Sequence, residues 1–170
     1  MSETRVATIL HDAIMRFVPS GHAVNERAIF RRTVPIIVDT GVLLGAIDAG
    51  DRDHLGAVAV LEAHVGQLLV AAPVVVETAW QLETNVGVEA EASLLDAIVA
   101  EELLVVELTM SDYARSVALI GEYADLGLGL VDASVVAIAE RLKVERIATL
   151  NRRDFNVVRP QHCDGFELIP

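Results

Sequence analysis

The feature that most constrains the fold is a regular alternation of short apolar runs with longer segments of helical spacing. The first run, Ile36–Val38, consists of β-branched residues and stops at Asp39, as expected for a strand buried on both faces. The same signals predict strands at residues 36–39, 67–71, 103–107, 146–149 and 166–169, and helices at 40–49, 51–65, 73–86, 89–100, 110–124 and 131–142. Strands separated by helices predict an α/β fold with three layers, in which helices cover both faces of a central, mostly parallel sheet of four or five strands.

Local signals support several of the predicted helix ends. Thr40 is a suitable cap for the first helix of this pattern, and Thr109 or Ser111 for the fifth. Pro73 suits a first helical position, and Gly87 is expected to stop the helix that contains Pro73. No internal repeat and no low-complexity tract interrupts the pattern.

Residues 1–33 differ from the rest of the chain. Their apolar residues follow the spacing of an amphipathic helix and are Val6, Ile9, Leu10, Ala13, Ile14 and Phe17. A Pro-Ser-Gly turn at residues 19–21 then ends this pattern, and residues 22–33 are polar and basic without a period. We interpret residues 1–33 as an N-terminal extension, which is a docking helix, a flexible arm or sequence upstream of the natural start. The domain itself is expected to span residues 34–170.

Composition excludes some classes of protein. Hydrophobic residues make up 53% of the chain, but charged residues or proline interrupt every apolar run before the roughly 18 residues needed to span a bilayer. The N-terminus lacks the uninterrupted apolar region of a signal peptide. Cys163 is the single cysteine, so no intrachain disulfide forms, which fits a cytoplasmic protein. The high apolar content suggests a sheet buried on both faces and an apolar surface covered by a partner.

The net charge of −12 argues against indiscriminate binding to nucleic acid, which depends on Lys and Arg. The basic residues are unevenly distributed, however. Six of the thirteen lie close together in the C-terminal part, namely Arg141, Lys143, Arg146, Arg152, Arg153 and Arg159. Two interpretations stay open: a basic edge that binds nucleic acid beside a cluster of acids, or a solvated helix end and loop.

Polar side chains follow the predicted strands at the edge where α/β proteins bind ligands. Asp39 and the stretch from Asn151 to Asp154 each come directly after a strand, Asp132 opens a helix, and Glu77 lies one turn into another. Carboxylates buried together are costly unless they share a cation. Because the donors are hard oxygens without a His or Cys cluster, the pattern favours Mg²⁺ or Mn²⁺.

Each acid also has an ordinary structural explanation. Asp39 could cap the following helix, and Asp132 would be favoured by the dipole of its own helix. Glu77 could be exposed on the polar side of its helix. Asp154 could form an Asx-turn or pair with a neighbouring arginine. The argument for a shared site therefore depends on the four acids occurring together, in this order and at these ends of the elements.

Four ordered segments carry a family resemblance. Residues 37–40 read Ile-Val-Asp-Thr, residues 77–80 Glu-Thr-Ala-Trp, residues 130–137 Leu-Val-Asp-Ala-Ser-Val-Val-Ala, and residues 148–155 Ala-Thr-Leu-Asn-Arg-Arg-Asp-Phe. Over about residues 35–169 the chain resembles the PIN-domain ribonucleases, specifically the VapC-type toxins of bacterial VapBC toxin–antitoxin pairs. The resemblance implies the PIN-like α/β/α fold.

The resemblance also implies the roles of the acids. Asp39, Glu77 and Asp132 match the three principal metal-binding acids of the family, with Mg²⁺ or Mn²⁺ as the cofactor. The family pattern usually has an Asp two residues after the Thr, where this chain has Asn151. The amide oxygen of Asn151 can still coordinate a metal ion or hold a water molecule, but with less negative charge, so a second metal ion is expected to bind weakly. Asn151 and Asp154 both stay open as the fourth ligand, and Asp154 is the candidate for the missing catalytic carboxylate.

The remaining implied roles concern support, substrate and partners. Thr40 and Thr149 would hold the acids or a water molecule. The implied activity is metal-assisted hydrolysis of RNA, which leaves 5′-phosphate and 3′-hydroxyl ends. Arg152 and Arg153 are candidates for binding RNA phosphates, or else a pair of surface loop residues. A homodimer and a cognate VapB-like antitoxin are implied as well.

Three other classes compete with a nuclease. A haloacid-dehalogenase-like phosphatase needs a second Asp where this chain has Gly41. A response-regulator receiver needs an Asp at the end of the third strand, which here ends with Glu107. The serious alternative is a PIN-fold protein with weak or lost catalysis that acts as a protein- or RNA-binding module, and Asn151 is the residue that supports it.

We predict that deleting residues 1–33 leaves the fold and the activity intact, because the strand and acid pattern begins after them. Thermal unfolding of the truncated and full chains checks this. A large loss of melting temperature in the truncated chain would show that the extension is part of the core.

Overall fold

The computed structural model describes residues 34–169, so the helix expected within residues 1–33 lies outside the described residues. Five strands form one sheet: β1 (Ile36–Val38), β2 (Leu68–Ala71), β3 (Leu104–Val106), β4 (Arg146–Ala148) and β5 (Glu167–Ile169). Their order is β3-β2-β1-β4-β5, and every neighbouring pair is parallel. The predicted α/β class is confirmed, with a sheet that is parallel throughout.

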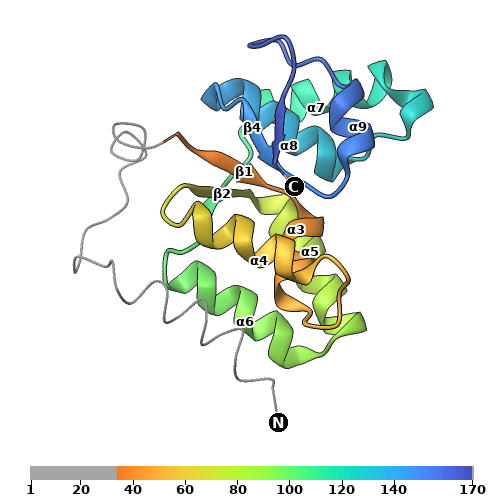
Figure 1. Ribbon diagram of the computed structural model, residues 1–170. Coiled ribbons are helices and arrows are strands. Elements are labelled where there is room, and N and C mark those ends of the chain that lie inside the picture. Colours follow the sequence, from red (N-terminus) through yellow and green to blue (C-terminus); the bar gives the residue numbers. More distant parts are fainter. Residues whose placement is uncertain (1–33, 170) are drawn as a thin grey trace.

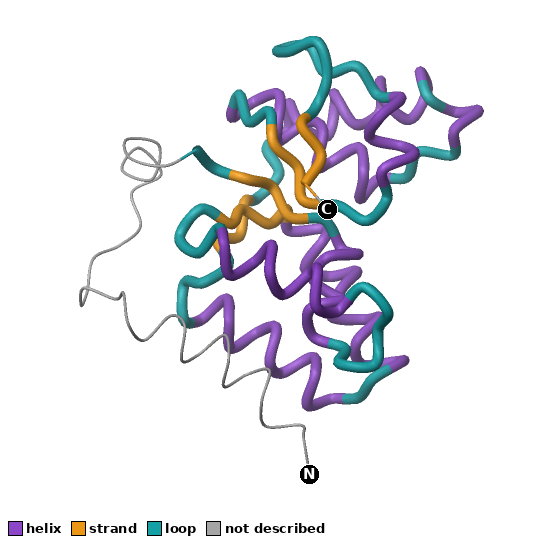
Figure 2. The backbone as a smooth tube through the Cα atoms, viewed as in Figure 1, coloured by secondary structure: helices purple, strands orange, loops and turns teal. Residues whose placement is uncertain are grey.

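Helices cover both faces of this sheet. They are α3 (Thr40–Ile47), α4 (His54–Ala63), α5 (Ala72–Asn85), α6 (Val88–Val99), α7 (Met110–Glu122), α8 (Leu130–Leu142) and α9 (Arg152–Val157), with a 3-10 turn η1 at Ala124–Leu126. Figure 1 shows α3 to α6 below the strands and α7 to α9 above them. Figure 2 shows the strands as the middle of three layers. Among the helices of the described residues, none is both long and apolar enough to cross a bilayer.

The core forms where the central strands meet α8. Every residue of β1 and β2 is buried, as expected for parallel strands that are covered on both faces. In α8 the eight residues from Ala133 to Glu140 are all buried, because this helix packs against α7, α5 and the sheet and does not lie at the surface. The first turn of α8 is thereby fixed against the carboxyl ends of the strands.

The helix caps differ in one respect from expectation. Asp39, and not Thr40, caps α3: its carboxylate accepts a hydrogen bond from the Thr40 backbone N–H at 2.8 Å. The chain is still extended at Asp39, which is the N-cap conformation, and becomes helical at Thr40. Thr109 caps α7 in a capping box with Asp112, and Pro73 lies in the first turn of α5, as predicted.

Tertiary contacts occupy some of the basic residues that cluster in the C-terminal part of the sequence. Arg141 donates to the buried carboxylate of Asp112 at 2.9 Å. Arg146 lies 3.5 Å from the Glu167 carboxylate. Arg115 makes a two-pronged bond to Glu140, at 2.7 and 2.9 Å, and this bond and the Arg141–Asp112 pair both join α7 to α8. Breaking a largely buried ion pair leaves an uncompensated charge, so Arg115 and Arg141 have structural roles. The Arg146–Glu167 pair is a surface pair, since the Glu167 side chain is 67% exposed.

Leu94 and Leu95 on α6 provide a test of the core. Leu94 is completely buried, whereas the side chain of Leu95 is 46% exposed. We predict that Leu94→Ala lowers the free energy of unfolding by about 2–5 kcal/mol, because it leaves a cavity. Leu95→Ala on the same helix should change it by less than about 0.5 kcal/mol. Urea unfolding of both variants measures the difference, and equal losses would contradict this packing.

Candidate active site

Asp39 lies at the point where β1 ends and α3 begins, and its side chain is 5% exposed. One carboxylate oxygen accepts from the Thr40 backbone N–H, and the other accepts from the Thr149 hydroxyl at 2.7 Å. The Asp39 backbone N–H donates to Ala148 of the neighbouring strand at 2.9 Å. Two parallel strands therefore set both the position and the orientation of this carboxylate.

Glu77 reaches the same edge from α5. Its Oε2 atom accepts a hydrogen bond from the hydroxyl of Thr40. Thr40 thus contacts two acids, Asp39 through its backbone and Glu77 through its side chain. Val76 and Trp80 on the same helix are exposed, and Glu77 itself is half-buried.

Asp132 is the third residue of α8, directly beside this pair. Burial raises the pKa of Asp132 to about 6, and the negative charges of Asp39, Asp154 and Glu77 add to the increase. Burial also raises the pKa of Asp39, opposed by its hydrogen bonds to Thr149 and Thr40 and reinforced by Glu77. The four acids are therefore close enough to repel one another.

The fourth acid is held by the segment after β4. The Asn151 backbone N–H donates to the Thr149 hydroxyl at 2.9 Å, and the Asn151 side-chain amide donates to Asp154 Oδ2 at 2.8 Å. The other oxygen of Asp154 is buried without a hydrogen bond and lies 3.7 Å from the Arg153 Nε atom. Asn151 therefore positions Asp154 through its side chain. Asn151 is itself held by the Thr149 hydroxyl, which also donates to Asp39.

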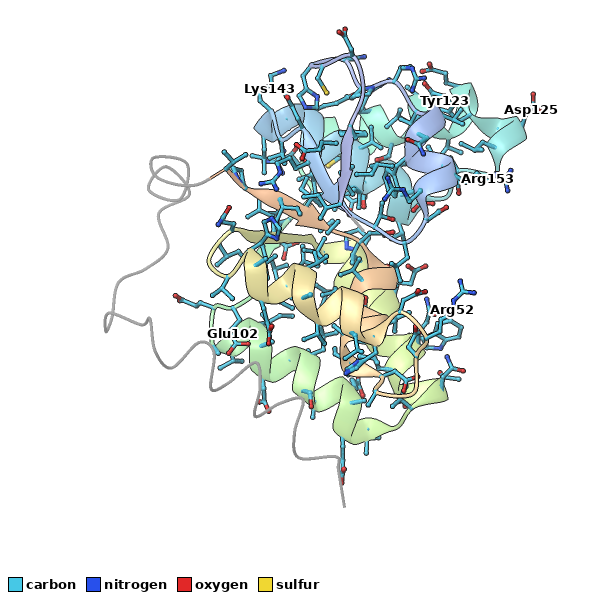
Figure 3. The ribbon with its side chains drawn as sticks, in the orientation of Figure 1. Arg52, Glu102, Tyr123, Asp125, Lys143 and Arg153 are labelled. Atoms are coloured by element: carbon cyan, nitrogen blue, oxygen red, sulfur yellow. The ribbon has the colours of Figure 1, made fainter. Side chains whose placement is uncertain are left out.

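Helix α9 was not predicted from the sequence, and it changes the interpretation of the arginines. Arg152 and Arg153 are exposed residues in the first turn of a helix, and not in a loop. Figure 3 shows Arg153 projecting from α9 at the outer surface. Because Asp154 lies in the same turn, both arginines border the acid cluster.

The carboxylate oxygens of the site suit a hard cation, although the side chains are not arranged as a set of metal ligands. The available atoms are carboxylate oxygens, which Mg²⁺ and Mn²⁺ prefer, and one oxygen of Asp154 is buried without a hydrogen bond. Within residues 34–169, no three or more His, Cys, Asp or Glu side chains have the arrangement of a ligand set. The fold therefore brings the acids close enough to repel one another.

Comparison with known proteins assigns the family. Residues 36–159 match the PIN domain, which is most of the chain. The chain belongs to the PIN-domain family. This PIN-domain protein is 30% identical to ribonuclease VapC26 of Mycobacterium tuberculosis over 135 residues, which are 79% of this chain and all of that protein. Its sequence thus groups it with the VapC proteins, as the sequence motifs indicated.

Solved structures show the same fold. The M. tuberculosis toxin VapC20, which cleaves the sarcin-ricin loop, has a TM-score of 0.64 at 18% identity, covering 69% of this chain and 91% of that one. DNA-bound VapBC from Salmonella typhimurium has a TM-score of 0.59 at 14% identity, covering 80% and 97%. At these identities the likeness concerns the fold, and the roles of the individual residues depend on the geometry above.

The repulsion among the acids predicts a stability effect in metal-free solution. Because the pKa of Asp132 is about 6 in the folded protein and 3.8 for an unperturbed aspartate, the folded protein binds more protons between these values and loses stability as pH rises through them. We predict that Asp132→Asn is more stable than the wild type above this window, by about 1–2 kcal/mol once solvent screening is included. The difference should disappear below pH 3.8.

Urea unfolding in excess chelator at the two pH extremes measures this effect. Asp125→Asn is the matched control, because Asp125 is an exposed acid in η1 that Figure 3 shows at the outer surface. An Asp132→Asn protein that is less stable than the wild type at high pH would show that the carboxylate makes a net favourable contact.

Proposed function

We propose that this PIN-domain protein is a metal-dependent endoribonuclease that acts as the toxin of a type II toxin–antitoxin pair. The observation that carries the proposal is the set of four acids from separate elements, whose mutual repulsion contributes to raising the pKa of Asp132 to about 6. Such a cluster lowers stability and is explained by a function that uses it. The family assignment and the ribonuclease name of the VapC26 relative support RNA as the substrate.

In the proposed site, Asp39, Asp132 and Glu77 hold Mg²⁺ or Mn²⁺. When bound, the cation supplies an activated water for attack on the phosphodiester and offsets negative charge on the phosphate and the leaving oxygen. Asp154 is the candidate for the fourth catalytic carboxylate, and Asn151 orients it through the bond of 2.8 Å. Because Asn151 is neutral where the family pattern has an Asp, a second cation would meet less negative charge in this site.

The other polar residues of the site hold its geometry and bind substrate. Thr149 and Thr40 fix the carboxylates of Asp39 and Glu77, so that little rearrangement is needed when substrate arrives. Arg152 and Arg153 are exposed beside the acids and would bind phosphates that flank the scissile bond. The substrate would then lie across the carboxyl edge of the sheet, between α5 and α9.

We also propose a cognate antitoxin and a homodimer as partners, and the cytoplasm as the location of the RNA substrate. Proteins of the same fold have been solved as VapBC assemblies. The outer face of α7 exposes large apolar side chains at helical spacing, namely Met110, Tyr113, Val117 and Ile120. A face of this kind supports docking of another protein.

A binding module with weak catalysis is the second candidate, and Asn151 favours it. The fourth acidic position of the family pattern carries an amide here, and Asp154 is the nearest substitute for the missing charge. Metal-dependent turnover separates the two candidates, because a binding module would bind RNA or protein without cleaving.

We predict that the antitoxin-free protein cleaves a mixed RNA pool with Mg²⁺ or Mn²⁺ and not in excess chelator. Asp39→Asn and Asp132→Asn should each reduce the cleavage rate by about 100-fold or more, because each removes a ligand charge. The Asp125→Asn control should cleave like the wild type. Gel analysis of time courses measures the rates.

Cleavage that continues in chelator, or that survives both substitutions, would contradict the proposed mechanism. If folded wild-type protein binds the cation by calorimetry but cleaves nothing in the pool, the binding-module function is supported instead.

A further inference from the structure

Trp80 is the single tryptophan of the chain, and 64% of its surface is exposed. It lies on α5, three residues after Glu77. Large aromatic side chains of monomeric proteins are usually well buried, so an exposed tryptophan beside a candidate active site indicates a binding contact. Val76, on the same helix, is 70% exposed and extends the apolar surface.

Helix geometry places this aromatic side chain at the rim of the acid cluster. Successive residues of an α-helix are turned by about 100°, so Trp80 falls between Glu77 and Val76 around the axis of α5. The buried side of α5 is formed by Val74, Thr78 and Leu82, with Glu77 at its border. Residues three apart on one helix have Cβ atoms about 5–6 Å apart. Trp80 is therefore the first exposed side chain outside Glu77.

The two helices that carry Trp80 and the arginines border the same acids. The negative charges of Glu77 on α5 and Asp154 on α9 both help to raise the pKa of Asp132. Glu77 is also held by the hydroxyl of Thr40, which fixes this face of α5 against the site. A strand of RNA crossing the acids would have Arg153 on one side and the Trp80 indole on the other.

The distribution of basic residues suggests that RNA is bound by more than ionic contacts to its phosphates. Eight Lys and Arg residues follow residue 33: Arg52, Arg115, Arg141, Lys143, Arg146, Arg152, Arg153 and Arg159. Several of these are paired with acids, among them Arg115, Arg141 and Arg146. Within residues 34–169, few Lys and Arg residues are therefore left unpaired to release counterions from RNA. Stacking of bases on aromatic rings does not depend on net charge.

We propose that the Trp80 indole is a stacking platform for an unpaired base next to the phosphate that is cleaved. This inference rests on the proposed function and assigns a base-binding side chain to the proposed site. A base within a duplex is stacked on both faces and does not reach a protruding indole, whereas an unpaired base does. Val76 would cover the edge of the same base or of its neighbour.

The test uses the full chain with Asp39→Asn, so that RNA is bound without being cleaved. Because Trp80 is the single tryptophan, intrinsic fluorescence reports on this residue alone. We expect quenching by a single-stranded oligonucleotide and little quenching by a duplex of the same sequence. Fluorescence anisotropy of labelled RNA gives the affinity of variants that lack the tryptophan.

In that background we expect Trp80→Ala to weaken binding of single-stranded RNA by about ten-fold or more, the worth of one base–aromatic stack. Trp80→Phe should restore most of the affinity, because it keeps an aromatic face. Leu55→Ala is the matched control, since Leu55 is an exposed apolar residue on α4, and its affinity should not change. Thermal unfolding confirms that each variant is folded.

Unchanged affinity in Trp80→Ala would overturn the inference. If that variant also shifts from dimer to monomer in sedimentation, Trp80 belongs to a protein interface instead. The proposed function is tested separately by cleavage with Asp39 intact. If Trp80→Ala cleaves RNA as fast as the wild type and still needs metal, the stacking platform is rejected and the proposed function stands. If the protein neither cleaves nor binds RNA, the proposed function and the stacking platform are both rejected.

Discussion

The carboxylate of Asp39 is the group on which both the fold and the site depend. It caps α3, accepts a hydrogen bond from Thr149 at the end of the neighbouring strand, and lies close enough to Glu77 and Asp132 to interact with their charges. Parallel pairing of β1 with β4 makes this possible, because it brings the ends of the two strands to one edge. A helix cap and a candidate metal ligand are thus the same side chain.

The acid cluster lowers stability, and the rest of the molecule compensates. Burial and repulsion raise the pKa values of Asp39 and Asp132, which means that their charged forms are disfavoured in the fold. The sheet, which is buried on both faces, and the buried helix α8 supply the apolar contacts that hold the acids together. The ion pairs Arg115–Glu140 and Arg141–Asp112 further join α7 to α8, whose first turn carries Asp132.

An acidic protein that acts on RNA must bind it without a broad basic surface. In our proposal the exposed Arg152 and Arg153 make local phosphate contacts, and Trp80 offers an aromatic face that is insensitive to net charge. Binding through a few contacts beside the acids favours substrates with exposed bases. It also limits attraction to nucleic acid in general, which a charge of −12 opposes.

The sequence by itself determined the α/β class, the position of each strand and the acids that meet at the sheet edge, because strand period and helix spacing are local properties. Its motifs also indicated the family. Only the tertiary structure decided that Asp39 caps α3, that Arg141 pairs with Asp112, and that Trp80 is exposed. Helix α9 was missed because six residues with a single buried side chain, Phe155, show no periodicity. Pairing and exposure depend on which elements pack together, and that information is not contained in the spacing of residues along one element.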